Sequence, residues 1–357
     1  MTGPVCRPLF TPSLPRRPRV IADGWYSWVG QPDGPHPWTA LTAVLARLPE
    51  PVARWLPAAG WRRGLVLAGL SGWADAVAVN RYDPGWRTLL ISRALLGRRR
   101  KLVVLQFFDH PPRGWTGRLI ARVESWALGR SLAVAQVLTP AERAVYPSRF
   151  GLEPDRFVLI PFAARVSEVG TPPPRPRAAG PVLAAGRAHC DWETLFAAAA
   201  GRGWDLEVVV GAADRVRVEA LNAQTRAGAH ISVELDADTV SALLDRATIS
   251  VIAVTDGLVG RGHIRLAAAT DAGAAIVASD VRSLEGYVRA GVTAELVPPG
   301  DPLALRQAVE GLLAAPERRA ALAGAAFAAA EVWTGARYVA ALQALASAAA
   351  TTAVATG

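Results

Sequence analysis

The chain has 357 residues, of which 51% are hydrophobic and 19% charged, which excludes a disordered protein and predicts two domains. Its two cysteines, Cys6 and Cys190, are too few for a disulfide framework or a cysteine-based zinc site, and they fit a reducing compartment. The net charge of +9 is uneven, because residues 1–178 carry 25 basic and 11 acidic residues and residues 179–357 carry 14 and 19. The basic first half is typical of a protein that meets something anionic, although a generally arginine-rich composition gives the same count.

The two ends of the chain give no clear secretion or membrane segment. Prolines interrupt the first 20 residues, so we expect no secretory signal. The uncharged tail Tyr338–Gly357 is rich in alanine and threonine rather than leucine, which favours an amphipathic or peripheral helix over a transmembrane span. We therefore expect a cytoplasmic protein, with the inner face of a membrane as a candidate location.

Short apolar runs alternate with amphipathic stretches through the first half of the chain. The expected strands are Arg63–Gly69, Ala74–Asn80, Lys101–His110, Leu132–Thr139 and Arg156–Phe162. The expected helices between them are Gly85–Leu96, Arg113–Leu128 and Ala141–Phe150. This alternation predicts a parallel sheet with helices on both faces.

A segment rich in proline and glycine, Ser167–Gly180, then separates the first half from a second series of alternating elements. The second series has expected strands at Pro181–Ala185, Leu206–Val210, Ile231–Leu235, Ile249–Val254, Ala275–Ala278 and Glu295–Val297. Its expected helices are Trp192–Ala200, Ala237–Ala247, Gly262–Ala272, Ser283–Ala290, Pro302–Ala314, Ala320–Val332 and Thr334–Ala349. The fold class is therefore α/β, with two βα domains in tandem.

Ligands of open parallel sheets bind where strands end and helices begin, so these positions carry the candidate site of the second half. Gly186 and Arg187 follow the first expected strand of the second half. A turn with a fixed cation at this position suits the binding of a diphosphate. The alternative is a glycine needed for packing beside an ordinary surface arginine. The loop Thr255–His263 has three glycines ahead of an expected helix, which suits phosphate or ribose, or makes it a plain flexible loop.

The candidate site of the first half is Asp109 with His110, at the end of an expected strand. A carboxylate beside an imidazole suits a general base or a clamp for an acceptor hydroxyl, unless Asp109 caps the next helix or turn. The basic segment Leu95–Lys101 either docks on anionic headgroups or is a solvated loop. We expect no metal, because the histidines are isolated in sequence, and no nucleic-acid partner, because no reading motif accompanies the basic residues.

The second half resembles the GT-B glycosyltransferases of the family 4 type, and the likeness extends from about Ala74 to Leu322. It is clearest over Ala247–Asp301, where a glycine loop enters a helix, a V-A-S-D strand follows, and L-V-P-P-G-D closes the series. Upstream, the segment V-L-A-A-G-R-A-H-C-D-W is similar to the phosphate-contacting turn of that family.

This resemblance implies a fold of two Rossmann-like domains with a cleft between them. Residues 1–166 would be the acceptor-side domain, residues 167–180 a linker, residues 181–333 the nucleotide-sugar domain, and residues 334–357 a helix that packs back on the first domain. It implies a retaining, metal-independent transfer of a hexose-type sugar from a nucleotide-diphospho-sugar to a hydroxyl on a small molecule, glycan or lipid-linked acceptor, with no further cofactor. It also implies that Gly186 and Arg187 touch the diphosphate, that the loop with Asp256, Gly257 and Gly262 lines the sugar and phosphates, and that Glu285 lies near the ribose. His189 and His263 join these donor-site candidates because both follow expected strand ends. Asp109 and His110 would position the acceptor.

The sequence departs from the family pattern at three places. Ala268 stands where the family has a glutamate. The family pairs that glutamate with an acidic residue upstream, and this second position falls near Gly260, with Asp256 close by. Where the family has a second phosphate-binding cation, this sequence has His189 or Cys190. These departures leave two alternatives open, a GT-B binding or scaffold protein without catalysis and a relative that hydrolyses or epimerises a nucleotide sugar.

Overall fold

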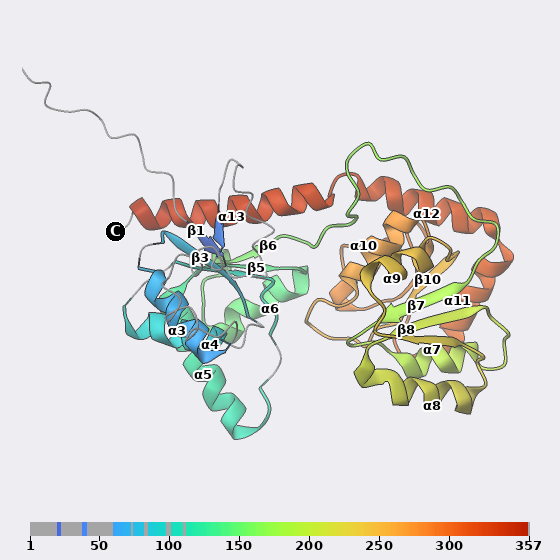
Figure 1. The fold of residues 1–357 in the computed structure, drawn as a ribbon, viewed down its shortest axis with the longest axis horizontal. Coiled ribbons are helices and arrows are strands. Elements are labelled where there is room, and N and C mark those ends of the chain that lie inside the picture. Colours follow the sequence, from blue (N-terminus) through green and yellow to red (C-terminus); the bar gives the residue numbers. More distant parts are fainter. Residues whose placement is uncertain are drawn as a thin grey trace, which may run out of the picture.

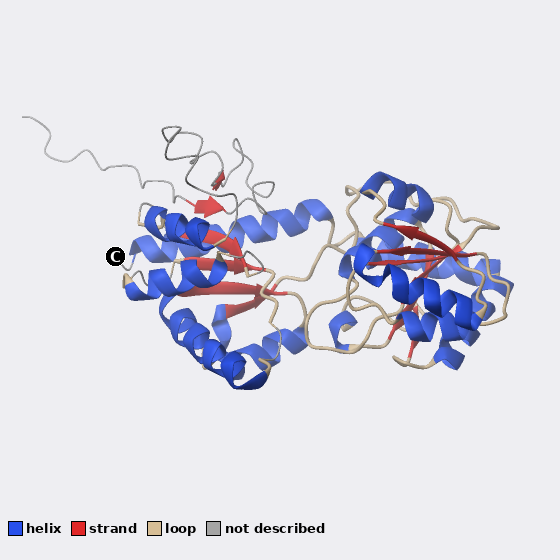
Figure 2. Ribbon diagram, turned by 60° about the horizontal axis from the view of Figure 1, so that its bottom comes forward, coloured by secondary structure: helices blue, strands red, loops and turns tan. Residues whose placement is uncertain are grey.

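The computed structural model describes residues 20–22, 38–40, 60–72, 74–81, 85–97, 101–109 and 112–355. Two parallel sheets, each of six described strands, lie side by side and are joined by a linker and by a long C-terminal helix (Figure 1). Helices lie on both sides of the sheets (Figure 2). The expected fold class, two Rossmann-like α/β domains, is confirmed.

The first sheet has the strand order β2-β1-β3-β4-β5-β6, and all its neighbouring strands are parallel. Its strands are β1 (Val20–Ala22), β2 (Trp38–Ala40), β3 (Ala76–Asn80), β4 (Leu102–Leu105), β5 (Leu132–Val137) and β6 (Phe157–Leu159). Strands β3 and β4 are buried at every residue, which explains why their sequences are continuously apolar instead of alternating.

Helices on one face of the first sheet form a common core with it. They are α3 (Trp61–Leu70), α4 (Trp86–Leu95), α5 (Gly114–Ser131) and α6 (Pro140–Phe150), and a short 3-10 turn η2 (Pro154–Arg156) precedes β6. The strand expected at Arg63–Gly69 is wrong, because this segment lies inside α3. Gly64, Leu67 and Ala68 are its buried residues, and their spacing of three and four positions is that of a helix face.

The second sheet has the strand order β12-β11-β10-β7-β8-β9 and is also parallel throughout. Its strands are β7 (Val182–Gly186), β8 (Leu206–Val210), β9 (His230–Val233), β10 (Ile249–Ile252), β11 (Ala275–Ser279) and β12 (Glu295–Val297). Its helices are α7 (Trp192–Ala199), α8 (Arg215–Thr225), α9 (Ala237–Leu244), α10 (His263–Ala272), α11 (Pro302–Ala314) and α12 (Pro316–Ala330), with 3-10 turns η3 (Ala212–Asp214) and η4 (Arg282–Leu284).

Two helices of the second half differ from expectation. Helix α8 was not expected; it has a single buried residue, Val218, so its sequence shows almost no apolar periodicity. The helix expected at Ser283–Ala290 is wrong, because only the short turn η4 forms there. Gly286 follows it with φ of 83°, a left-handed conformation that ends a helix.

The last helix, α13 (Gly335–Ala355), crosses back from the second sheet to the first (Figure 1). Its side chains at Tyr338, Leu342, Ala346 and Ala350 join the core on the face of the first sheet opposite α3–α6. The hydroxyl of Tyr338 also lies 3.2 Å from the amide nitrogens of both Gln106 and Gln136. Helix α13 is therefore part of the core of the first domain.

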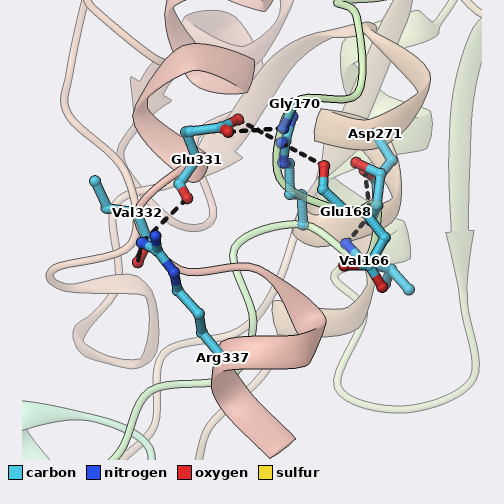
Figure 3. A network of polar contacts seen from close by, with 9 residues as sticks. Val166, Glu168, Gly170, Asp271, Glu331, Val332 and Arg337 are labelled. Atoms are coloured by element: carbon cyan, nitrogen blue, oxygen red, sulfur yellow. Dashed lines mark hydrogen bonds and ion pairs between the residues drawn. The ribbon is translucent and has the colours of Figure 1, made fainter. Parts of the chain in front are cut away.

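The chain passes between the two sheets twice, and the two passages are tied together (Figure 3). Arg165, which is fully buried, forms an ion pair with Glu331 and donates to the carbonyl oxygen of Glu168. The other oxygen of Glu331 accepts from the backbone nitrogen of Gly170 at 2.9 Å. Asp271 of α10 accepts from the backbone nitrogen of Val166 at 2.6 Å. The start of the linker and the α12–α13 junction therefore form one polar network.

Candidate active site between the two sheets

The carboxyl ends of the two sheets face each other, and specific contacts join them. Glu142, at the start of α6, accepts a hydrogen bond from the backbone nitrogen of Gly260 at 3.0 Å. The hydroxyl of Tyr287 donates to the carbonyl oxygen of Leu138 at 2.7 Å and accepts from the backbone nitrogen of Phe162 at 2.8 Å. Because parallel sheets bind ligands at their carboxyl ends, the region between these edges is the candidate active site.

Gly186 ends β7 at this edge and is closely covered. A methyl group in its place would overlap the sulfur of Cys190 and would lie 2.8 Å from Nη1 of Arg265. Arg265 comes from the first turn of α10, and its Nη1 donates to the carbonyl oxygen of Ala185 at 3.0 Å. The partly buried guanidinium of Arg265 thus lies directly over Gly186, where only a glycine leaves room for it.

The N-terminus of α10 points to the same edge. Gly262 precedes the helix with φ of 80°, a conformation that favours glycine, and within the described residues no side chain caps this end. The first backbone N–H groups of an uncapped helix attract anions. With the guanidinium of Arg265, they form a positive site that is suited to a diphosphate.

The expectation for Arg187 is only partly met. It follows β7 as expected, but its side chain is 66% exposed, pairs with Glu234 at 3.3 Å and donates to the carbonyl oxygen of Leu235. Both partners follow β9, the edge strand on the side of β7 away from β10. The guanidinium therefore lies away from the N-terminus of α10, because a carboxylate at the end of β9 holds it there.

His189 and Cys190 differ in exposure. His189 is exposed and has φ of 57°, and its carbonyl oxygen accepts from the backbone nitrogen of Thr255. Cys190 is buried, and this burial raises the pKa of its thiol. The thiol packs between Gly186 and Arg265 and accepts a hydrogen bond from Nη1 of Arg265 at 3.4 Å, so a guanidinium from α10 lies beside this position.

His263 is not available as a donor-site residue, contrary to expectation. It is buried, its ring stacks on Tyr287 with centroids 4.1 Å apart, and its Nε2 lies 2.6 Å from the carbonyl oxygen of Ser283. Because a carbonyl oxygen only accepts, Nε2 carries the proton. Burial lowers the pKa of His263 to about 4, so the ring is neutral at pH 7. It packs beneath the glycine loop, against Gly260.

The remaining donor-site candidates, Asp256, Gly257 and Glu285, lie in loops that follow strands at the carboxyl end of the second sheet. Asp256 pairs with Arg282 at 3.0 Å, and this hydrogen bond lowers the pKa of its carboxyl group. Gly257 lies beneath the guanidinium of Arg261, which donates to the carbonyl oxygens of Thr255 and Asp256. Glu285 is exposed and follows η4. The structure thus brings Gly186, Asp256, Gly257 and Gly262 to one edge, together with Arg265.

Asp109 is not placed as a catalytic base or acceptor clamp. It follows β4, but it is buried and forms ion pairs with both Arg81 and Arg149. Both oxygens of this carboxylate are therefore engaged by guanidinium groups of the first domain. His110, the other expected acceptor-side residue, lies outside the described residues, as do residues 98–100 of the basic segment.

Two site residues, Glu142 and Arg265, were not expected. Glu142 is fully buried; its Oε2 accepts from the backbone nitrogens of Leu138 and Thr139, and burial raises its pKa to about 7. The sequence T-P-A-E at 139–142 is a capping box that marks the start of α6, but it does not show that the carboxylate reaches the second domain.

The described residues contain neither a metal cluster nor a membrane-spanning helix. No group of three or more His, Cys, Asp or Glu side chains in them could hold a metal ion. None of the helices in the described ranges, α13 included, is long and apolar enough to cross a membrane.

Comparison with known proteins gives a family match within the second domain. Residues 195–315 match the family described as Glycosyl transferases group 1. No curated protein gives a significant match to the chain.

Solved structures with this fold cover nearly the whole chain. Sucrose-phosphate synthase from Thermosynechococcus elongatus is 17% identical, with a TM-score of 0.67 over 92% of this chain and 98% of that chain. HepE of Anabaena in complex with UDP-glucose is 13% identical, with a TM-score of 0.68 over 94% and 100%. WaaG, a glycosyltransferase involved in lipopolysaccharide biosynthesis, is 13% identical, with a TM-score of 0.53 over 81% and 95%.

At these identities the structural likeness establishes the two-domain GT-B fold, and the family match concerns the second domain. The chain therefore has the GT-B fold, and residues 195–315 of its second domain match the Glycosyl transferases group 1 family.

Proposed function

We propose that the protein transfers a hexose-type sugar from a nucleotide-diphospho-sugar to a hydroxyl group, without a metal ion and with retention of configuration. The observation that carries this proposal is the site formed by Gly186, Arg265 and the uncapped N-terminus of α10. The site offers a guanidinium and backbone N–H groups to a leaving diphosphate, and these stabilise its charge as the bond to the sugar breaks.

The donor would bind the second domain, and the acceptor would enter from the first domain across the facing sheet edges. Retention requires no in-line base, which agrees with the engagement of both Asp109 oxygens by arginines. The complex of HepE with UDP-glucose makes UDP-sugars the first donors to test. The acceptor hydroxyl belongs to a small molecule, a glycan or a lipid-linked sugar, the last of which would place the protein at the inner face of a membrane.

The test is a screen of UDP-, GDP-, ADP- and TDP-sugars by thermal shift, followed by transfer assays with the donor that binds. We expect one nucleotide sugar to raise the melting temperature, and transfer to persist in EDTA with the product in the same anomeric configuration as the donor. Failure of every donor to bind would overturn the proposal. Inversion, or loss of transfer in EDTA, would overturn the mechanism.

Ala268 favours a second candidate, a GT-B protein that binds a nucleotide sugar without transferring it. Position 268 lies within α10 and carries a methyl group where the family has a carboxylate. Calorimetry distinguishes the two candidates, because binding of a donor without turnover in the presence of varied acceptors favours the binding protein. Release of free sugar, or of an epimer of the donor, would instead indicate a hydrolase or an epimerase.

A further inference from the structure

Helix α5 is attached to the first domain by only one of its halves. Its buried residues, Glu124, Ala127, Leu128 and Ser131, all belong to its second half, and the ten residues before Glu124 include none. In Figure 1, α5 extends beyond the neighbouring helices of the domain. The first half of α5 is therefore a ridge that projects from the domain, and packing against the sheet does not explain its sequence.

The exposed side of this ridge is apolar. Trp115 and Leu119 are 72% and 55% exposed, and Val123 and Trp126 continue the line at 39% and 41%. On a helix with 3.6 residues per turn, these four side chains fall within an arc of about 80°. Ile120 adds a fifth exposed apolar side chain beside them. A continuous apolar stripe on a projecting helix marks an interaction surface.

The charges around the stripe have one sign. Arg113, Arg118, Arg122 and Arg130 are all exposed. The helix has one acidic residue, Glu124, which is buried and paired with Arg81 and Arg87, so it does not offset the arginines at the surface. A basic, tryptophan-containing apolar stripe with no exposed carboxylate matches the headgroup region of an anionic bilayer.

We infer that α5 docks the protein on an anionic lipid bilayer, with Trp115, Leu119, Val123 and Trp126 inserted among the acyl chains and the arginines at the headgroups. The convex shape fits a bilayer better than a second copy of the chain, since a copy would have to supply a groove rich in carboxylates. The helix begins just after the carboxyl end of β4, on the edge that faces the second domain. Docking would therefore bring the cleft close to the membrane, where, if the proposed transfer is correct, the acceptor is lipid-linked.

The test measures binding of the full chain to vesicles by flotation, with no donor present, so its result does not depend on transfer activity. The vesicles are phosphatidylcholine alone or phosphatidylcholine with about a third phosphatidylglycerol. One double variant, Trp115→Ser with Leu119→Ser, removes the apolar anchors, and a second, Arg118→Gln with Arg122→Gln, removes charge. The controls are Val216→Ser with Val332→Ser, and Arg215→Gln with Arg318→Gln, which change exposed apolar side chains and exposed arginines outside α5.

We expect the wild type to float with the anionic vesicles only, and to be released by salt. Each α5 double variant should weaken partitioning by about tenfold or more, whereas the controls should bind as the wild type does. Because these side chains are exposed, all variants should melt at the temperature of the wild type. Absence of binding to anionic vesicles would overturn the inference. So would α5 variants that bind normally, or a wild-type dimer in sedimentation that the tryptophan–leucine variant dissociates.

Discussion

The carboxylate of Glu142 in the first domain lies 3.0 Å from the backbone nitrogen of Gly260 in the glycine loop of the second domain. The same loop rests on His263, whose Cε1 would be 2.6 Å from a methyl group at Gly260. Two buried titratable groups of opposite charge type therefore meet on either side of one glycine. Burial raises the pKa of Glu142 to about 7 and lowers that of His263 to about 4. The stability of this junction therefore depends on pH through both residues, with opposite signs.

The first prediction concerns Glu142. Because its pKa rises from 4.5 in the unfolded chain to about 7 in the folded protein, its contribution to stability is complete below pH 4.5 and is lost as pH rises to 7. The loss is on the order of 3 kcal/mol. Glu142→Gln should remove this falling component from the pH dependence of the free energy of unfolding, measured by urea melts from pH 4 to 7.5. Glu219→Gln, an exposed residue of α8, is the control and should leave the pH dependence unchanged.

The second prediction concerns His263, whose linkage has the opposite sign. Its pKa falls from 6.5 to about 4 on folding, so the stability is complete above pH 6.5 and is lost as pH falls to 4. In the wild type this slope opposes that of Glu142 between pH 4.5 and 6.5. His263→Gln, which keeps a donor for Ser283, should leave only the decrease in stability with rising pH that is due to Glu142. Glu142→Gln should leave only the increase in stability with rising pH that is due to His263. Equal slopes in the two variants would contradict this assignment, and His230→Gln, an exposed histidine, serves as the control.

The third prediction separates the two arginines near Gly186. Arg265→Ala should lower kcat/KM about a hundredfold, because a charge-assisted contact to the diphosphate is worth about 3 kcal/mol. Arg187→Ala should lower it less than tenfold, since Glu234 holds this side chain on the far side of β7. Arg265→Lys should recover part of the activity. Donor affinity by calorimetry and the melting temperature of each variant distinguish lost binding from lost folding, and a larger effect at Arg187 would reverse the assignment.

The fourth prediction uses two glycines of α3. A methyl group at Gly64 would overlap the carbonyl oxygen of Gly85 and lie 2.8 Å from the nitrogen of Leu89, so Gly64→Ala must push α3 away from α4. We expect a loss of about 2 kcal/mol in the free energy of unfolding. Gly69→Ala has open space and should instead stabilise the helix by up to about 1 kcal/mol. Denaturant melts of the two variants should shift in opposite directions.

The alternation of strands and helices was predictable because strands buried on both faces are continuously apolar, and most of the strands appear where that pattern placed them. The strand predicted at Arg63–Gly69 is wrong because a short apolar run has the same composition in a strand and in a helix. What distinguishes the helix is the close packing of Gly64 against α4, and the sequence of this segment alone does not show that partner. Helix α8 was missed because it lies on the surface and buries only Val218.

The candidate site was predictable in its location but not in its contacts. The glycines 186, 257 and 262 mark the strand ends, and the fold brings them to one edge. A sequence does not show which arginine a carboxylate holds, so the pattern of strand ends points to Arg187 and does not reveal Arg265. Nor does it show that Asp109 meets two arginines from other elements, or that Glu142 spans the cleft.

The packing of α13 on the first sheet has a consequence for synthesis on the ribosome. The sheet face that holds Val20, Ala78 and Leu105 is closed by residues 338–350, which are made after the entire second domain. Domains ordinarily fold in the order in which they emerge. Here that face of the amino-terminal half stays uncovered until residues 338–350 have been made, so a chain that stalls or terminates before them would expose an unfinished hydrophobic surface.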